Sequence, residues 1–139
     1  MDFSFIKLPR GVQMRKPYQG EMDYFSKNPK VAGMATEDGK VILNPYTQLK
    51  PDEYQSVAYN EAARLLIKKE PSLRPDFELT QQQQSFLDSS TYMNASDEDR
   101  KATIAARLMS GDPSAGAATA EQTLYVETLK RRLFAGGEE

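Results

Sequence analysis

The sequence PDEYQSVAYNEAARLLIKK at residues 51–69 decides the fold, because it has the pattern of a long amphipathic helix. Apolar side chains recur at helical spacing along one face, at Tyr54, Val57, Ala58, Leu65 and Leu66. Pro51 suits the first helical position, and the acidic residues after it and the lysines at the far end complement the helix dipole. We predict one helix over residues 51–69, which Pro71 prevents from continuing.

The residues before this helix, 31–44, have the pattern of a β-hairpin. Two short apolar runs flank Asp38-Gly39, a dipeptide that is favoured where a tight turn needs positive φ. Gly33 lies inside the first run and predicts either a bulge or a close approach of the backbone to another segment. Pro45 ends the second run.

After residue 69, the sequence contains start signals for further helices. A Ser or Thr precedes a Gln or Asp at the spacing of a capping box in three places: Thr80 with Gln83, Ser96 with Asp99, and Thr119 with Gln122. A shorter helix is predicted over residues 21–28, and Gly111 predicts a helix end. Together these patterns predict an α+β, mainly helical fold with one small β-hairpin and three to four helices.

We expect a single mainly helical domain over residues 21–134, since a chain of 139 residues suits one hydrophobic core. Proline and glycine interrupt residues 1–20, so this segment is predicted to be an N-terminal arm. Residues 135–139 are rich in glycine and glutamate and are predicted to be a flexible tail.

The composition limits the chemistry of the protein. The chain has no His and no Cys, which removes the commonest general base at neutral pH, the soft metal ligands and the thiol nucleophile. We therefore expect no metal and no cofactor. The formal charge of −2 argues against a nucleic-acid partner. No apolar run approaches the roughly 18 residues of a membrane span, so no membrane association is expected.

The N-terminal segment combines aromatic and basic side chains. Those predicted to contact a partner protein are Phe3, Phe5, Arg10, Arg15 and Tyr18. The functional interpretation is an arm that reaches onto that partner. The alternative is a loosely packed terminus whose charged side chains are solvated. The low hydrophobic content, 39%, favours a chain that is ordered partly by its neighbours.

A possible polar site lies within the predicted helix, at Asn60, Glu61 and Arg64. Its spacing resembles the zinc-peptidase motif in which two histidines bind the metal and the glutamate between them is the general base. Asn60 and Arg64 take the places of the histidines, and a guanidinium cannot bind zinc. The helix is either a peptidase-like scaffold without its metal or an accidental match. Glu61 is either a binding or acid–base carboxylate or one half of a structural ion pair with Arg64.

Four stretches together resemble small uncharacterised proteins of tailed bacteriophages, especially those of the short-tailed type. They are NPKVAGMA at residues 28–35, VILNPY at 41–46, NEAAR at 60–64 and AARLMSGDPS at 105–114. The resemblance spans roughly residues 28–133 and brings no assigned catalytic residues. It implies a phage context, with the protein in the virion or in the cytoplasm of the bacterial host.

The function predicted from these features is a non-enzymatic protein-binding component, a phage virion or assembly protein whose partners include other virion proteins. A phage-encoded inhibitor that binds a host enzyme is the first alternative. A metal-independent or degenerate hydrolase that uses Glu61 is the second.

Overall fold

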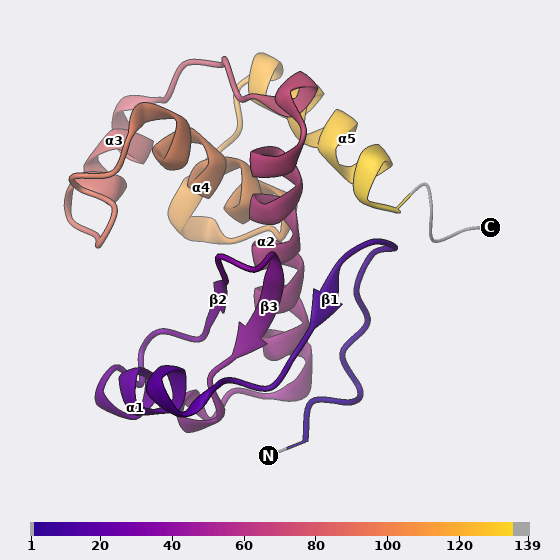
Figure 1. Cartoon of the computed structure of the whole chain (residues 1–139). Helices are drawn as coiled ribbons and strands as arrows, with labels where there is room; N and C mark the ends of the chain where they lie inside the picture. The colour runs from indigo at the N-terminus through magenta and orange to yellow at the C-terminus, as the bar shows by residue number, and fades with distance from the viewer. Residues whose placement is uncertain (1, 135–139) are drawn as a thin grey trace.

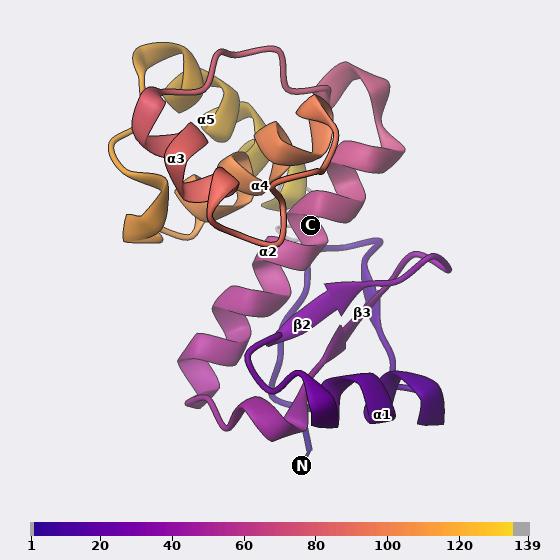
Figure 2. The same cartoon turned by 90° about the vertical axis from the view of Figure 1, so that its left-hand side faces the viewer.

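One long helix, α2 (Pro51–Lys69), runs through the molecule and carries a lobe at each end (Figures 1 and 2). The computed structural model describes residues 2–134. The sheet lobe (residues 2–50) contains β1 (Gln13–Met14), α1 (Gln19–Lys27), β2 (Gly33–Ala35), β3 (Lys40–Leu43) and the 3₁₀ helix η1 (Pro45–Thr47). The helical lobe (residues 70–134) contains η2 (Pro71–Leu73), α3 (Gln81–Asp88), α4 (Asp97–Met109), η3 (Pro113–Ala115) and α5 (Ala120–Phe134).

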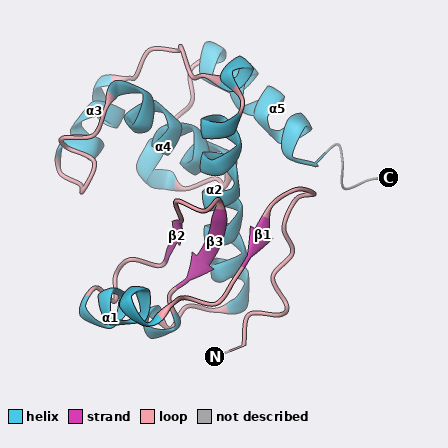
Figure 3. Ribbon diagram, viewed as in Figure 1, coloured by secondary structure: helices cyan, strands magenta, loops and turns pink. Residues whose placement is uncertain are grey.

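The predicted α+β, mainly helical fold is confirmed, and the strands are confined to one lobe (Figure 3). Residues 2–134 contain five α-helices, where three to four were predicted. The bounds predicted for α2 agree with the structure. Among these residues, no helix has the length and apolar character needed to cross a membrane.

The hairpin predicted over residues 31–44 is present as β2 and β3. The two strands pair antiparallel, with Met34 opposite Ile42, and Gly39 takes the positive φ of 77° that its turn requires. A third strand, β1, pairs parallel with the other edge of β3 and gives the order β1-β3-β2. The sequence did not predict β1, because two residues are too few to show a strand's alternation.

Gly33 marks a close approach of two elements and not a bulge. A Cβ at this position would lie 2.8 Å from Val57 Cγ1 and 3.0 Å from the Ile42 carbonyl oxygen. Real Cβ atoms almost never have contacts this short, so glycine allows β2 to lie directly against α2. This contact fixes the hairpin on the long helix.

Helix α2 contributes to two separate hydrophobic cores. In the sheet lobe, its Tyr54 and Ala58 pack with buried residues of β3. In the helical lobe, its Ala62, Ala63 and Ile67 belong to a larger cluster with α4 and α5. The small side chains on α2 and on the facing α4 allow the two helices to pack closely. Among the fully buried residues of α2, the boundary between the cores falls between Ala58 and Ala62.

The N-terminal segment, predicted to be an arm over residues 1–20, packs on the sheet lobe over the part that the structure describes. The Phe3 ring meets the Tyr54 ring edge-on at 4.8 Å. The backbone of Lys7 forms two hydrogen bonds with the Gln55 side chain, of 2.8 and 2.6 Å. The segment packs because β3 has a free edge for β1, and Tyr54 offers an apolar surface for Phe3. The predicted tail, 135–139, lies outside the described residues.

Candidate functional site

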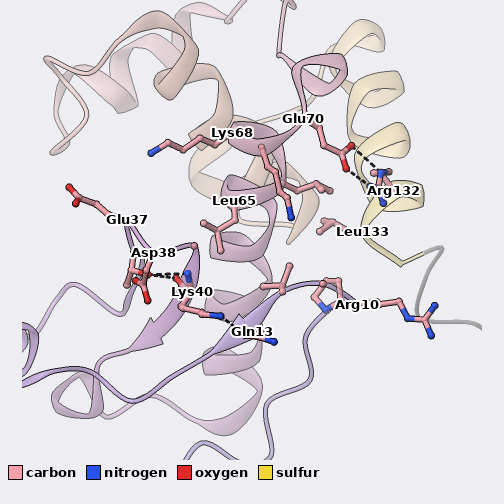
Figure 4. Close-up of a pocket in the computed structure, with 17 residues that line it drawn as sticks. Arg10, Gln13, Glu37, Asp38, Lys40, Leu65, Lys68, Glu70, Arg132 and Leu133 are labelled. Atoms are coloured by element: carbon pink, nitrogen blue, oxygen red, sulfur yellow. Dashed lines mark hydrogen bonds and ion pairs between the residues drawn. The ribbon is translucent and has the colours of Figure 1, made fainter.

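A groove of about 590 Å³ separates the two lobes and is the candidate functional site (Figure 4). Four segments that are distant in the sequence line it. They are residues 9–13, the hairpin turn at residues 36–40, the last turns of α2 with Glu70, and the end of α5. Its volume lies within the ~300–1,000 Å³ that is usual for ligand sites.

The groove has an apolar floor, formed by Val12, Leu65, Leu66 and Leu133. Leu65 packs against the sheet-lobe core, Leu66 packs against the helical-lobe core, and Val12 touches both. The floor therefore lies where the two cores meet, and there the α2 side chains Leu65 and Leu66 are only partly buried.

The rim of the groove is charged. Its cations are Arg10, Lys40, Lys68, Lys69 and Arg132, and its carboxylates are Glu37, Asp38 and Glu70. Glu70 forms an ion pair with Arg132, and the Lys40 ammonium donates a hydrogen bond to the Gln13 side chain. Within residues 2–134, neither Lys68 nor Lys69 has an ion-pair partner.

Arg15 neutralises the rim carboxylate of Asp38 from outside the groove. Its guanidinium donates to Asp38 at 3.1 and 3.2 Å and to Glu21 at 2.7 and 2.9 Å. The hydrogen bonds from Arg15 and Thr36 lower the pKa of Asp38 to about 2. The same guanidinium stacks on the Tyr18 ring, 3.8 Å from its centroid. Arg15 thus ties the hairpin turn to α1.

The five side chains predicted to contact a partner do not form a single cluster. Arg10 lines the groove. Arg15 and Tyr18 lie together beside α1, where Tyr18 is 63% exposed. Phe3 packs on the sheet lobe, and Phe5 beside it is 40% exposed. Of the five, the structure brings only Arg10 to the groove.

The predicted polar site lies at the boundary between the two cores, apart from the residues that line the groove. Glu61 Oε1 is 3.8 Å from Arg64 Nε, and the Glu61 side chain is 14% exposed. Arg64 Nη2 donates to the Tyr92 hydroxyl and to Thr103 Oγ1, both at 2.8 Å. The ion pair that was one interpretation of Glu61 is therefore present, and it continues into the helical lobe.

Burial has the largest effect on the pKa of the Glu61 carboxyl group. Burial raises this pKa. The charge of Arg64, a backbone hydrogen bond from Ala35 and the charge of Arg107 lower it, but the effect of burial is larger, so the pKa is raised overall. Asn60 Oδ1 and Arg107 Nε are buried, and neither has a hydrogen-bond partner within the described part of the chain. The cluster joins β2, α2 and α4, which is what a structural network between lobes requires.

Sequence patterns did not identify the groove. Lys68 and Lys69 were interpreted only as cations at a helix end, and Lys40 as part of a strand. The sequence signal for Lys68 and Lys69 is the nearby pair of leucines, Leu65 and Leu66, which Ile67 separates from the two lysines. No group of three His, Cys, Asp or Glu side chains in residues 2–134 is arranged to hold a metal ion.

Comparison of the chain with protein-family models, with curated proteins and with solved structures gives no match.

Proposed function

We propose that the protein is a non-enzymatic protein-binding component that holds a segment of its partner in the groove between the lobes. The observation that carries this proposal is the combination of an apolar floor with a charged rim in one groove. Apolar surface supplies most of the affinity of protein interfaces, and charges at the rim direct and orient the partner.

The polar groups of the groove suit recognition better than catalysis. Asp38 and Glu70 are engaged by arginines. Thr36, the hydroxyl residue of the lining, is occupied because its Oγ1 accepts a hydrogen bond from the Lys40 N–H at 3.0 Å. Nucleophilic or general acid–base catalysis needs a reactive group held beside its activator. The described lining residues offer charged points of contact instead.

The proposal of a phage context is supported by the resemblance of four stretches within residues 28–133 to small proteins of tailed bacteriophages. We propose a virion or assembly protein, present in the particle or in the host cytoplasm during assembly. A phage inhibitor of a host enzyme would use the same groove, and the identity of the bound protein distinguishes the two.

The proposal is tested by making the floor of the groove polar. Leu65→Ser should reduce the amount of this protein in purified phage particles by about tenfold, measured by quantitative mass spectrometry. Leu124→Ser is the matched control, since Leu124 lies on α5 and is 71% exposed. Far-UV circular dichroism verifies that both variants are folded.

Unchanged particle content of the Leu65→Ser variant would contradict the proposal. Recovery of the wild-type protein with a stoichiometric host protein, and not with particles, would identify it as a host-directed inhibitor. That interaction should also be lost in Leu65→Ser.

A metal-independent or degenerate hydrolase that uses Glu61 is the second candidate, and the raised pKa of the buried Glu61 carboxyl group favours it. Enzymes use buried carboxyl groups with a raised pKa as general acids or bases. Glu61→Gln keeps the shape of the side chain and removes its titration. A Glu61→Gln protein that remains folded and retains full biological effect would eliminate this candidate.

A further inference from the structure

We propose that the segment held in the groove is acidic and amphipathic, with its carboxylates facing Lys40, Lys68 and Lys69 and its apolar side chains on the leucine floor. This inference rests on the proposed function and adds the chemistry of the partner.

The charge of the groove is opposite to that of the chain. The protein has 18 Lys and Arg against 20 Asp and Glu, with a formal charge of −2. The groove reverses this balance, with five cations and three carboxylates in its lining. A basic groove in an acidic protein attracts acidic ligands and repels basic ones.

The carboxylates of the rim are less available than their number suggests. Asp38 is held by Arg15, which lies outside the lining, and Glu70 is held by Arg132 within it. Glu37 remains as the rim carboxylate without an ion pair among the described residues. The lysines therefore make the electrostatic potential in the groove positive.

The lysines that line the groove come from two different elements. Lys68 and Lys69 lie at the end of α2, and Lys40 lies on the hairpin. Figure 4 labels Lys68 and Lys40 on these two elements. The helix dipole explains why lysines occupy the last turn of α2. It does not explain why the hairpin brings another cation to the same groove. An anionic ligand between the walls would contact both.

The apolar floor of the groove favours an anionic ligand that also carries apolar groups. Leu65 and Leu66 lie about one helical turn before Lys68 and Lys69 on α2, so the groove offers apolar and cationic contacts close together. A peptide that combines Asp or Glu with Leu, Ile or Phe would match both kinds of contact. A nucleic-acid backbone would contact the lysines but leave the leucines uncovered and would face the charge of Glu37.

The test selects peptides from a random display library with the full-length protein and then sequences them. Enriched peptides should contain more Asp and Glu, together with large apolar residues, than the starting library. The best peptide, labelled with fluorescein, should bind the protein in an anisotropy titration, and added salt should weaken the binding.

Two charge-reversed variants locate the binding site. Lys68→Glu with Lys69→Glu should weaken binding of this peptide by about tenfold or more. Lys27→Glu with Lys30→Glu changes the net charge equally at exposed positions outside the groove and should have little effect. Circular dichroism verifies that both variants fold.

Enrichment of basic or uncharged peptides, failure to enrich any peptide, or an equal loss of binding in both variants would overturn the inference. Tight binding of a single-stranded DNA oligonucleotide that competes with the peptide would also overturn it. Failure of this inference can be distinguished from failure of the proposed function. If Leu65→Ser abolishes particle incorporation but Lys68→Glu with Lys69→Glu does not, the proposed function is supported and the inference of an acidic partner segment is wrong.

Discussion

Asn44, the residue after β3, holds the sheet lobe together. It is fully buried, and its Nδ2 donates to the carbonyl oxygens of Phe25, Asn28 and Val31, the last at 2.7 Å. Its Oδ1 accepts the Tyr46 N–H at 2.8 Å. One side chain thus satisfies backbone groups from α1, the segment before β2 and η1.

Replacing Asn44 by alanine should lower the free energy of unfolding by about 2–4 kcal/mol, because several buried backbone groups lose their partner. Urea denaturation followed by circular dichroism measures the change. Asn94→Ala, at an exposed position, should change it by less than about 0.5 kcal/mol. A loss of under about 1 kcal/mol in Asn44→Ala would contradict this account of the buried network.

Asp38 gives the stability of the protein a specific dependence on pH. Its pKa is about 2 in the folded protein against 3.8 for the free side chain. The unfolded chain therefore binds more protons between these values, so the contribution of Asp38 is complete above pH 3.8 and is lost as the pH falls toward 2.

Asp38→Asn should therefore melt at a lower temperature than the wild type at pH 6, and the difference should shrink as the pH falls through that window. Thermal melts across the pH range measure it. Asp23→Asn, on the exposed face of α1, is the control. A difference in melting temperature that is constant down to pH 2 would show that Arg15 does not stabilise the Asp38 carboxylate.

Sequence patterns could not have predicted the roles of these residues. The sequence pattern places Asn44 only at the end of a strand, and it predicts Arg15 to contact a partner protein, not Asp38 and Glu21. Their partners lie on other elements, and the spacing of residues along a chain carries no information about such contacts.

At the scale of elements, the start of α3 and the start of α5 are joined by a pair of glutamines. Gln83 and Gln122 each complete a capping box with the threonine three residues before. The two buried amides also bond each other, with Gln83 Nε2 2.9 Å from Gln122 Oε1 and Gln122 Nε2 2.8 Å from Gln83 Oε1. The residues that cap the helices also position them relative to one another.

A double-mutant cycle should reveal this pairing. Gln83→Met and Gln122→Met each remove the two hydrogen bonds between the buried amides, so the two costs in unfolding free energy should not add. The coupling should be about 1–3 kcal/mol, measured by chemical denaturation. Gln83→Met combined with Thr128→Ala, at an exposed site of α5, should be additive within about 0.5 kcal/mol. Additivity in the first pair would mean that the amides do not stabilise each other.

The elements themselves were largely predictable. The bounds of α2, the hairpin turn at Gly39 and the starts of α3 and α5 follow from local chemistry, and the structure has all of them. Of the two hydrogen bonds of the capping box predicted at Ser96, one is present. Ser96 Oγ accepts the Asp99 N–H at 3.1 Å, but no return bond forms, because aspartate is one methylene shorter than glutamate.

At the scale of the whole molecule, two cores share one helix, and this arrangement should make the lobes open separately. Leu129→Ala creates a cavity in the helical-lobe core at a fully buried position. It should cost about 2–5 kcal/mol and reduce amide protection in α4 and α5 more than in β3.

Hydrogen exchange followed by mass spectrometry measures this difference between the lobes. Leu124→Ala on the exposed face of α5 is the control and should leave protection unchanged. Equal loss of protection in β3 and α4 would show that the network around Glu61 couples the lobes into one cooperative unit.

The two-lobed arrangement and its groove were beyond prediction from this sequence. The apolar periodicity of residues 51–69 showed which face of α2 is buried, but not that one end of it packs on strands and the other on helices. The groove arises only when residues 9–13, the hairpin turn and the end of α5 meet. Their contacts are tertiary, and no local pattern encodes them.

The parallel pairing of β1 with β3 also affects how the chain folds as it leaves the ribosome. β1 is synthesised before its partner, since Gln13 and Lys40 are 27 residues apart. The β2–β3 hairpin closes through a local turn within about 1–10 μs, whereas β1 must close a longer loop across α1. Until β3 has emerged and paired, Phe3 and Val12 have no core to cover them. During that interval, these apolar side chains remain exposed to solvent on the nascent chain.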